Sequence, residues 1–324
     1  MSSKTNMYLG VDVAKDTLAV CLMDAHKTVQ LRATYANTPP GFRQLWRALG
    51  GMDPAALHIG MEATGIYWEA LAQWAHAQRA VVFVLNPARV KAFSRAEGQR
   101  QKTDPVDAGV IARFILAQAL HPWTPPAPAL RELTALVRRL DGISAMLRVE
   151  KNRAATATLP VVRASLRRTS AALKKEYAVL ARAGERILAA TPALAHDLAL
   201  LMTIPGVSRI TARRLLVFLR RTPYETARQA GAASGLTPTH CLSGTSIHKK
   251  PHISRLGDAA LRQALFSPAV CARRYNPRMV PWAQGLTQRG KCNKVVICAI
   301  ARKLVHCAFG VLKHQTPFQP PQAA

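Results

Sequence analysis

The chain has 324 residues, of which 49% are hydrophobic, and it carries 45 Lys and Arg against 17 Asp and Glu, a formal net charge of +28. The hydrophobic content excludes a disordered chain, and the apolar runs, which Arg, Lys or Pro interrupt, predict no membrane span. The charge predicts self-repulsion unless a polyanion neutralises it, so we expect a nucleic acid as partner. The six cysteines form no CxxC pair and predict reduced thiols. The N-terminal residues lead directly into a predicted strand without room for a signal peptide, so we expect a cytoplasmic location.

Residues 8–23 predict a β-hairpin with an acidic residue inside it. Apolar residues flank Asp12, a turn follows at 14–16, and a second β-rich run follows at 18–23. A buried carboxylate without a partner costs several kcal/mol, so Asp12 is expected to lie beside a cation, a metal ion or a hydrogen-bond donor. The alternative is an aspartate that caps the turn after the strand, and this segment alone does not separate the two.

The segment that follows predicts strands and helices in alternation. Residues 30–35 favour a third strand, 57–61 form a short apolar strand that ends at Glu62, and 81–85 form a continuous apolar strand of the kind that is buried on both faces. Three antiparallel strands followed by alternating helix and strand predict a ribonuclease H-like α/β domain. Both Asp12 and Glu62 would then lie at or near strand ends.

Two more carboxylates begin the helix that is predicted over 103–116. Asp104 and Asp107 point the same way from its first turn because they are three residues apart. Acids placed for the helix dipole would explain either of them alone, but would not explain Asp12 and Glu62. Carboxylates suit hard divalent cations such as Mg²⁺, which can clamp the attacking and leaving oxygens in phosphoryl transfer. The four acids therefore predict a metal-dependent DNA-cutting site.

A proline-rich segment at 121–128 separates this region from two long predicted helices. Apolar residues recur every three or four positions over 133–147 and again over 173–187, and basic residues occupy the other faces. This spacing predicts a helical hairpin within one chain or a coiled coil that joins two chains, and it does not choose between them.

The turn at 204–207, Ile-Pro-Gly-Val, lies between two apolar helical segments and resembles a helix-hairpin-helix element. The backbone amides of such an element hold a nucleic-acid phosphate without reading sequence, although many such turns are purely structural. Basic residues after the turn and in the C-terminal region favour the contact. The predicted nucleic-acid-binding residues are Gly206, Arg209, Arg213, Lys249, Lys250, Arg255 and Lys291.

Residues 235–246 predict a long polar turn, and Lys and Arg surround Ser243 within this region. A serine in a loop is ordinarily a turn former, so its position alone gives Ser243 no chemical role. A final apolar helix is predicted over roughly 294–312.

Eight short motifs follow one another along almost the whole chain. They are GVDVAK at 10–15, MEATG at 61–65, KTDPVDA at 102–108, IPGV at 204–207, GLTP at 235–238, SG at 243–244, RGK at 289–291 and ARKL at 301–304. Each is weak alone, but the ordered set resembles the IS110-type (IS110/IS116/IS902/IS1111) transposases, to which the pilin-gene inverting recombinases are similar. The resemblance implies a RuvC-like DEDD domain over 1–122, a linker with coiled-coil helices over 123–192, and a mostly helical transposase domain over 193–324.

The resemblance also implies roles for the site residues. Asp12, Glu62, Asp104 and Asp107 would form the DEDD metal site, and a serine in the second domain is implicated as the nucleophile. That serine maps most naturally to Ser243. Ser246 and Ser254 are competitors, because loop length varies there.

The family is similar to RNA-guided recombinases, in which a noncoding RNA pairs with donor and target DNA. The resemblance further implies dimers and tetramers in which the metal site and the serine come from different subunits. The leading hypothesis is therefore a DNA transposase with a Mg²⁺ site and a serine nucleophile.

Three alternatives stand beside this hypothesis. The first is a metal-dependent RuvC-like nuclease or transposase without a covalent serine intermediate. The second is a non-catalytic nucleic-acid-binding protein whose acids are structural. The third is an actin-like sugar kinase, which shares a related fold, but the glycine-rich phosphate loops of those kinases have no counterpart here and the charge is a poor match for a small-metabolite enzyme.

Overall fold

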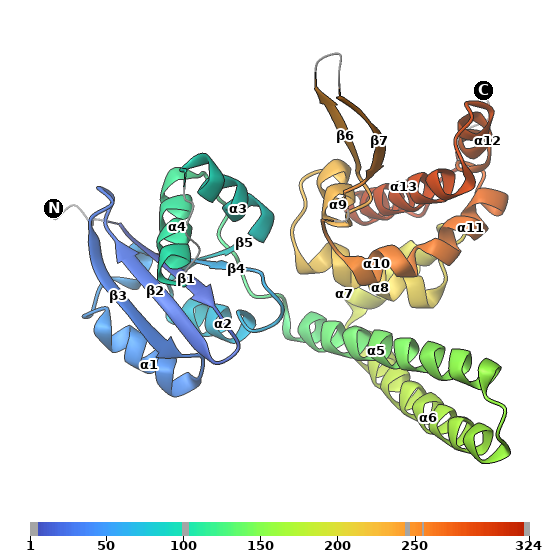
Figure 1. The fold of residues 1–324 in the computed structure, drawn as a ribbon, viewed down its shortest axis with the longest axis horizontal. Helices are drawn as coiled ribbons and strands as arrows, with labels where there is room; N and C mark the ends of the chain where they lie inside the picture. The colour runs from blue at the N-terminus through green and yellow to red at the C-terminus, as the bar shows by residue number, and fades with distance from the viewer. Residues whose placement is uncertain (1–5, 99–103, 244–246, 255, 321–324) are drawn as a thin grey trace. The chain divides into compact units, whose positions relative to one another are not determined.

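The computed structural model describes residues 6–98, 104–243, 247–254 and 256–320, and the side chains of 104–106, 240–243 and 247–251 lie outside the described set. The chain divides into two compact units, Met1–Pro125 and Pro126–Ala324 (Figure 1). Apolar clusters of buried residues fill each unit separately. The division into three parts that the resemblance implies stays a prediction.

A mixed sheet of five strands forms the centre of the first unit, in the order β3-β2-β1-β4-β5. Its strands β1, β2 and β3 pair antiparallel, whereas β1, β4 and β5 run parallel. The predicted ribonuclease H-like arrangement is thereby confirmed. The strands are β1 (Met7–Val13), β2 (Thr17–Met23), β3 (Val29–Ala36), β4 (Leu57–Glu62) and β5 (Val81–Leu85).

Helices cover both faces of this sheet. The first two helices pack on one face in a common apolar cluster with alternate residues of β1, β2 and β4, and α4 packs on β1, β2 and β4 from the other face. The side chains of Thr38 and Asn86 accept hydrogen bonds that cap α1 and α3. The helices are α1 (Pro39–Ala48), α2 (Glu69–Ala77), α3 (Pro87–Ala96) and α4 (Asp104–Ala117).

Two glycines allow α4 to lie directly on the sheet. A Cβ atom at Gly10 would overlap the carbonyl oxygen of Ala108 and lie 2.5 Å from the amide nitrogen of Ala112. A Cβ atom at Gly60, which pairs with Gly10, would lie 2.7 Å from Cγ2 of Ile115. Because no real Cβ atom tolerates such distances, glycine at these two positions sets the separation between α4 and the central strands.

The second unit is mostly helical (Figure 1). Its first two helices are long and pack against each other as a hairpin, and the remaining helices surround one apolar core. The elements are α5 (Pro128–Thr156), α6 (Pro160–Ala190), α7 (Pro192–Met202), α8 (Arg209–Arg221), α9 (Ala227–Ala233), β6 (Pro238–Ser243), β7 (Ile247–Ile253), α10 (Ala259–Ala264), α11 (Phe266–Tyr275), α12 (Val280–Gln288) and α13 (Asn293–His314). Association of α5 and α6 with a second chain stays a prediction.

The polar segment 235–246, predicted as a long turn, instead contains strand β6, which pairs with β7 in the residues that follow. In this hairpin Pro238 pairs with Ile253 and Ser243 pairs with Ile247 in an antiparallel register. The prediction from polar composition was wrong here, because strand pairing satisfies backbone groups regardless of side-chain polarity and β-branched residues such as Ile247 favour it.

Helix α13 is, among the described residues, the one helix with the length and hydropathy of a membrane span. It packs against α7, α9, α11 and α12, and Val296, Ile300, Leu304 and Ala308 are each 0% exposed within the core. Its apolar character is therefore that of a helix at the centre of the second unit.

Candidate metal site and nucleic-acid interface

Asp12 and Glu62 lie at the carboxyl ends of neighbouring parallel strands. The parallel register pairs Val11 with Met61, and each acid is the next residue along its strand. Val11 and Met61 pack in the cluster with α1 and α2. Since successive side chains of a strand point to opposite faces, Asp12 and Glu62 both face the side that α4 covers.

Helix α4 brings the third described carboxylate to the same face. Ala108 and Ala112 of this helix are buried with Cys21 of β2, and the helix backbone lies against Gly10. Asp107 immediately precedes Ala108 in the first turn and is half-buried. The fold thus directs acids from β1, β4 and α4 to one face of the sheet. The side chain of Asp104 lies outside the described residues.

The donor chemistry fits a hard divalent cation, although a closed cage is not formed. Within the described part of the chain, which includes the side chains of Asp12, Glu62 and Asp107, no three His, Cys, Asp or Glu residues are gathered closely enough to hold a metal ion. Carboxylates at the ends of parallel strands are the oxygen ligands that Mg²⁺ prefers, and this ion usually keeps several waters and is completed by substrate phosphates. Such a site needs only a few protein oxygens.

Asn37 ties together the loops that follow the two strand acids, and the sequence analysis did not single it out. Its side-chain nitrogen donates to the carbonyl oxygens of Ala14 (2.9 Å) and Tyr67 (3.2 Å). Ala14 lies in the turn after Asp12, and Tyr67 lies in the loop after Glu62. One amide therefore joins the two loops that follow the acids. An Asn between a strand end and the capping Thr38 is the signal that could have drawn attention to it.

Replacing Asn37 by alanine is expected to raise the concentration of divalent metal needed for half-maximal DNA cleavage by about tenfold, because groups that orient ligands tune metal affinity. The measurement is a Mg²⁺ titration of the cleavage rate. Thr38→Ala is the matched control, since it removes the neighbouring hydroxyl that accepts from the amide of Gly41 and leaves both loops tied. Equal shifts in both variants would show that Asn37 acts only through stability.

The positive charge is concentrated in the second unit. Residues 126–324 carry 32 Lys and Arg against 8 Asp and Glu, whereas residues 1–125 carry 13 against 9. At least five of those eight acids form ion pairs with arginines: Asp141, Glu150, Glu185, Asp197 and Asp258. We therefore expect the first unit to bind the metal ion through its carboxylates and the second unit to bind a polyanion through its cations.

Helices α7 and α8 flank the turn at 204–207, and α11 closes one side of it. Its resemblance to a helix-hairpin-helix element stays a prediction. Gly206 has φ +96°, and a Cβ atom there would lie 3.0 Å from the carbonyl oxygen of Pro268 and from the nitrogen of Ala272. Ser208 caps α8 by accepting from the amide of Thr211. On this side, the turn is therefore packed closely against α11.

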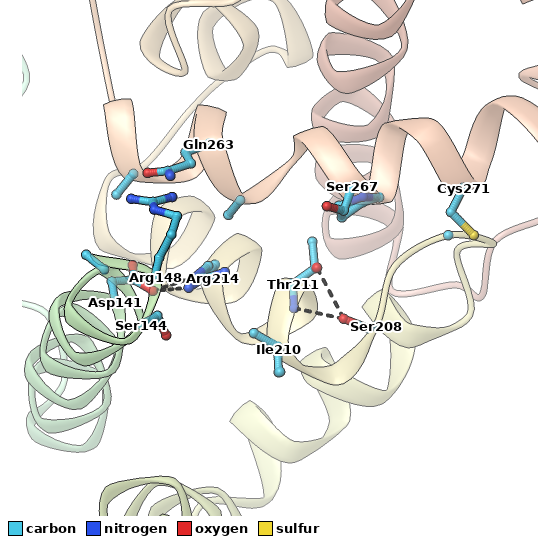
Figure 2. A pocket seen from close by; sticks show the side chains of 15 residues that line it. Asp141, Ser144, Arg148, Ser208, Ile210, Thr211, Arg214, Gln263, Ser267 and Cys271 are labelled. Carbon is cyan, nitrogen blue, oxygen red and sulfur yellow. Dashed lines mark hydrogen bonds and ion pairs between the residues drawn. The ribbon is translucent and has the colours of Figure 1, made fainter. Parts of the chain in front are cut away.

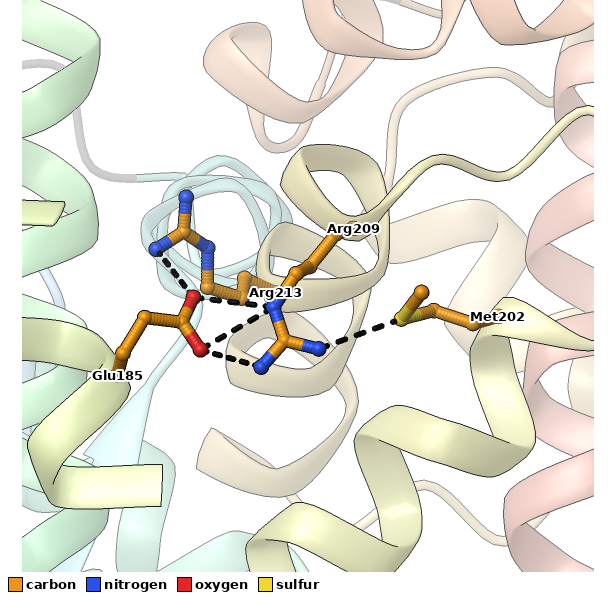
Figure 3. Close-up of polar contacts among 4 residues, drawn as sticks. All are labelled: Glu185, Met202, Arg209 and Arg213. Atoms are coloured by element: carbon orange, nitrogen blue, oxygen red, sulfur yellow. Dashed lines mark hydrogen bonds and ion pairs between the residues drawn. The ribbon is translucent and has the colours of Figure 1, made fainter. Parts of the chain in front are cut away.

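Arg209 and Arg213 both contact Glu185 of α6 (Figure 3). Nε of Arg209 donates to Oε1 of Glu185 over 3.0 Å, and Nη1 of Arg213 lies 3.4 Å from the same oxygen. The side chain of Arg213 is 7% exposed and that of Arg209 is 50% exposed. The hydrogen bond from Arg209, helped by the charges of both arginines, outweighs burial and lowers the pKa of Glu185. In this arrangement Glu185 compensates the charge of the buried Arg213.

Replacing Glu185 by glutamine is expected to destabilise the second unit by about 1–2 kcal/mol at pH 7, since Arg213 would be left buried without its acid. The effect is smaller than for a fully buried pair because Glu185 is 40% exposed. The pKa of Glu185 is lower in the folded protein than its ordinary value of 4.5. Its contribution to stability is therefore fully present above pH 4.5, and it is lost as the pH falls through the pKa that Glu185 has in the folded protein.

Urea unfolding of both proteins at several pH values measures this difference, which should shrink below pH 4.5. Glu176→Gln changes an exposed acid of the same helix and is expected to stay within about 0.5 kcal/mol of the wild type. A difference between Glu185→Gln and the wild type that did not change with pH would contradict the ion-pair explanation.

The other predicted site residues lie elsewhere in the second unit. Lys291 is exposed just before α13. Lys249 and Lys250 lie on β7, and only their backbone is described. Ser243 is the last residue of β6, and its side chain is outside the described set. Arg255 and Ser246 lie outside the described residues altogether. The amide of the competitor Ser254 donates to the carbonyl oxygen of Thr237 over 2.8 Å.

Comparisons with known proteins agree along the chain. A DEDD-type IS110 family model described as a transposase matches residues 9–160, and a model described as the transposase IS116/IS110/IS902 family matches residues 198–281. Pilin gene-inverting proteins of Moraxella bovis and Moraxella lacunata are 34% and 33% identical over 324 residues, and each match covers 98% of both chains. An uncharacterized 43.6 kDa protein of insertion element IS110 from Streptomyces coelicolor is 30% identical over 166 residues, which are 51% of this chain and 40% of that protein.

Proposed function

Because this chain belongs to the IS116/IS110/IS902 family of transposases, we propose that it cuts and rejoins DNA with a Mg²⁺ site in its first unit and a serine nucleophile in its second. The observation that carries the proposal is the placement of Asp12 and Glu62 at the ends of adjacent parallel strands, on the face covered by the helix that carries Asp107. A role limited to turn capping would not require acids from three elements to share one face.

The metal-binding residues of the proposal are Asp12, Glu62, Asp104 and Asp107. Bound Mg²⁺ would polarise the scissile phosphate and stabilise the charge that develops on its oxygens. The chain itself supplies the orientation of these ligands, through the parallel register of β1 and β4, the close approach of α4, and the tie that Asn37 makes between the two loops.

Ser243 is the proposed nucleophile. Its Oγ forms a bond to phosphorus, the bond from phosphorus to a deoxyribose oxygen breaks, and that oxygen leaves with a proton while the serine hydroxyl loses its own. The resulting phosphoserine keeps an activated phosphate, so a hydroxyl of a second DNA strand can reverse the step and complete the exchange. We propose that the acids and the serine of one active site come from different subunits of a dimer or tetramer.

The excess of cations in the second unit supports a guide RNA as a further partner of the proposed recombinase. If a noncoding RNA pairs with donor and target DNA, the protein side chains need not read the target sequence. Sequencing the RNA that co-purifies with the protein tests this part, and a match to the DNA that flanks the gene is expected. Co-purified RNA without such a match would contradict the proposal that an RNA guides the protein.

We expect the protein to act in the cytoplasm.

The reaction itself is tested with purified protein, Mg²⁺ and end-labelled DNA that carries the ends of the element. We expect a protein–DNA adduct that survives denaturation, followed by rejoined strands. The printed name of the Moraxella relatives, pilin gene-inverting protein, supports rejoining as well as cutting. Cleavage without an adduct would favour the second candidate, a metal-dependent nuclease or transposase that uses water or a 3′-hydroxyl.

A further inference from the structure

A groove of about 500 Å³ lies among α5, α8, α10 and α11 of the second unit (Figure 2). Side chains from all four helices line it, so segments more than a hundred residues apart in sequence meet there. None of the described residues that line it is aromatic. The polar side chains of the lining are Asp141, Ser144, Arg148, Ser208, Thr211, Arg214, Gln263 and Ser267.

The two arginines of the groove differ in their partners. Nε of Arg214 donates to Oδ1 of Asp141 over 2.6 Å, so an acid compensates its charge. Arg148 instead contacts the side-chain amide of Gln263. When the amide oxygen faces the guanidinium, one Nη atom of Arg148 donates to this oxygen over 3.1 Å. The amide is neutral, so this contact holds the guanidinium in place and leaves its positive charge available.

The groove uses a different side of α8 from the one that contacts α6. Ile210, Thr211 and Arg214 line the groove, whereas Arg209 and Arg213 reach Glu185. Because residues three or four apart share a face of a helix, these two sets lie on separate faces of α8. The face that pairs with Glu185 and the face that lines the groove are thus distinct.

We propose that this groove binds the sugar–phosphate backbone of one strand of duplex DNA, with Arg148 as the phosphate contact and the hydroxyls of Ser208 and Ser267 as further donors. Arginine and serine are typical phosphate contacts, and walls without aromatic rings offer no platform on which bases could stack. The excess of cations in this unit complements a polyanion. The inference rests on the proposed function in taking DNA as the occupant, and it predicts binding that does not depend on sequence.

The first test measures the affinity of the full-length protein for duplex DNA at several salt concentrations. Arg148→Ala is expected to weaken binding by about three- to fivefold near 0.1 M salt and to reduce the slope of log K against log salt by about 0.9, the value for one lost phosphate contact. Arg139→Ala is the matched control, because Arg139 is exposed on the opposite side of α5, nine residues away, and should leave the slope unchanged. An unchanged slope in Arg148→Ala overturns the proposal.

The second test needs no substitution. Cys271 of α11 lines the groove and is an exposed free thiol. Saturating duplex DNA is expected to slow its alkylation by iodoacetamide, read by mass spectrometry of the peptide. If DNA does not protect Cys271, the proposal is overturned. If RNA of the same sequence protects Cys271 and DNA does not, the proposal is overturned in favour of RNA.

The two tests also separate the groove from the proposed function. If the wild type neither binds nor cuts DNA, the proposed function fails; if it does both while Arg148→Ala behaves identically, only the groove assignment fails.

Discussion

Asp12→Asn is expected to slow DNA cleavage by about a thousandfold or more while leaving the first unit folded and DNA binding intact. Asparagine keeps the shape of the side chain but removes the charge that a divalent ion requires, and metal stabilisation of a phosphoryl transition state contributes several kcal/mol. Binding should persist because the excess of cations lies in the second unit. Single-turnover cleavage in Mg²⁺, together with a binding isotherm, measures both quantities.

Asp16→Asn provides the control for the loss of one negative charge. Asp16 is exposed in the turn that follows Asp12, and it contributes its backbone oxygen to the amide of Asn37, which the substitution retains. Its cleavage rate should match that of the wild type. Recombination that survived in a double variant, Asp12→Asn with Glu62→Gln, would instead make the acids structural and leave a non-catalytic DNA-binding protein.

Ser243→Ala is expected to abolish the covalent protein–DNA adduct and to reduce strand exchange by about a thousandfold or more, because removal of a nucleophile leaves only binding and electrostatic stabilisation. Metal binding and DNA affinity should be unchanged, since the substitution removes one hydroxyl at the end of β6. Denaturing gels of labelled DNA detect the adduct directly, and mass spectrometry of the DNA-linked peptide identifies the residue.

Ser254→Ala tests Ser254, one of the two competitors of Ser243 for the role of nucleophile. Ser254 follows β7 and keeps its backbone hydrogen bond to Thr237 in the variant, so the fold of the hairpin should not change. An adduct that disappears in Ser254→Ala and persists in Ser243→Ala would move the nucleophile to Ser254. Metal-dependent cleavage at the wild-type rate in Ser243→Ala would support the nuclease that works without a covalent intermediate.

The sequence by itself determined the first unit and the family. Short apolar, β-rich runs bounded by turn residues identified β1, β2 and β4 and placed Asp12 and Glu62 at or near strand ends, because such runs are a local property of the chain. Helical spacing likewise predicted α4, with Asp104 and Asp107 in its first turn, and the pair of long helices α5 and α6. The ordered motifs identified the family that the comparisons then showed.

Tertiary structure alone decided which groups meet across long stretches of chain. Asn37 reaches the loops of both acids, and Arg213 turns inward to Glu185, 28 residues away. The groove at Arg148 exists because four helices pack around it, and the hairpin of β6 and β7 forms because two polar segments pair. Local periodicity carries no information on such contacts, since they depend on how elements pack and on which charges burial forces to pair.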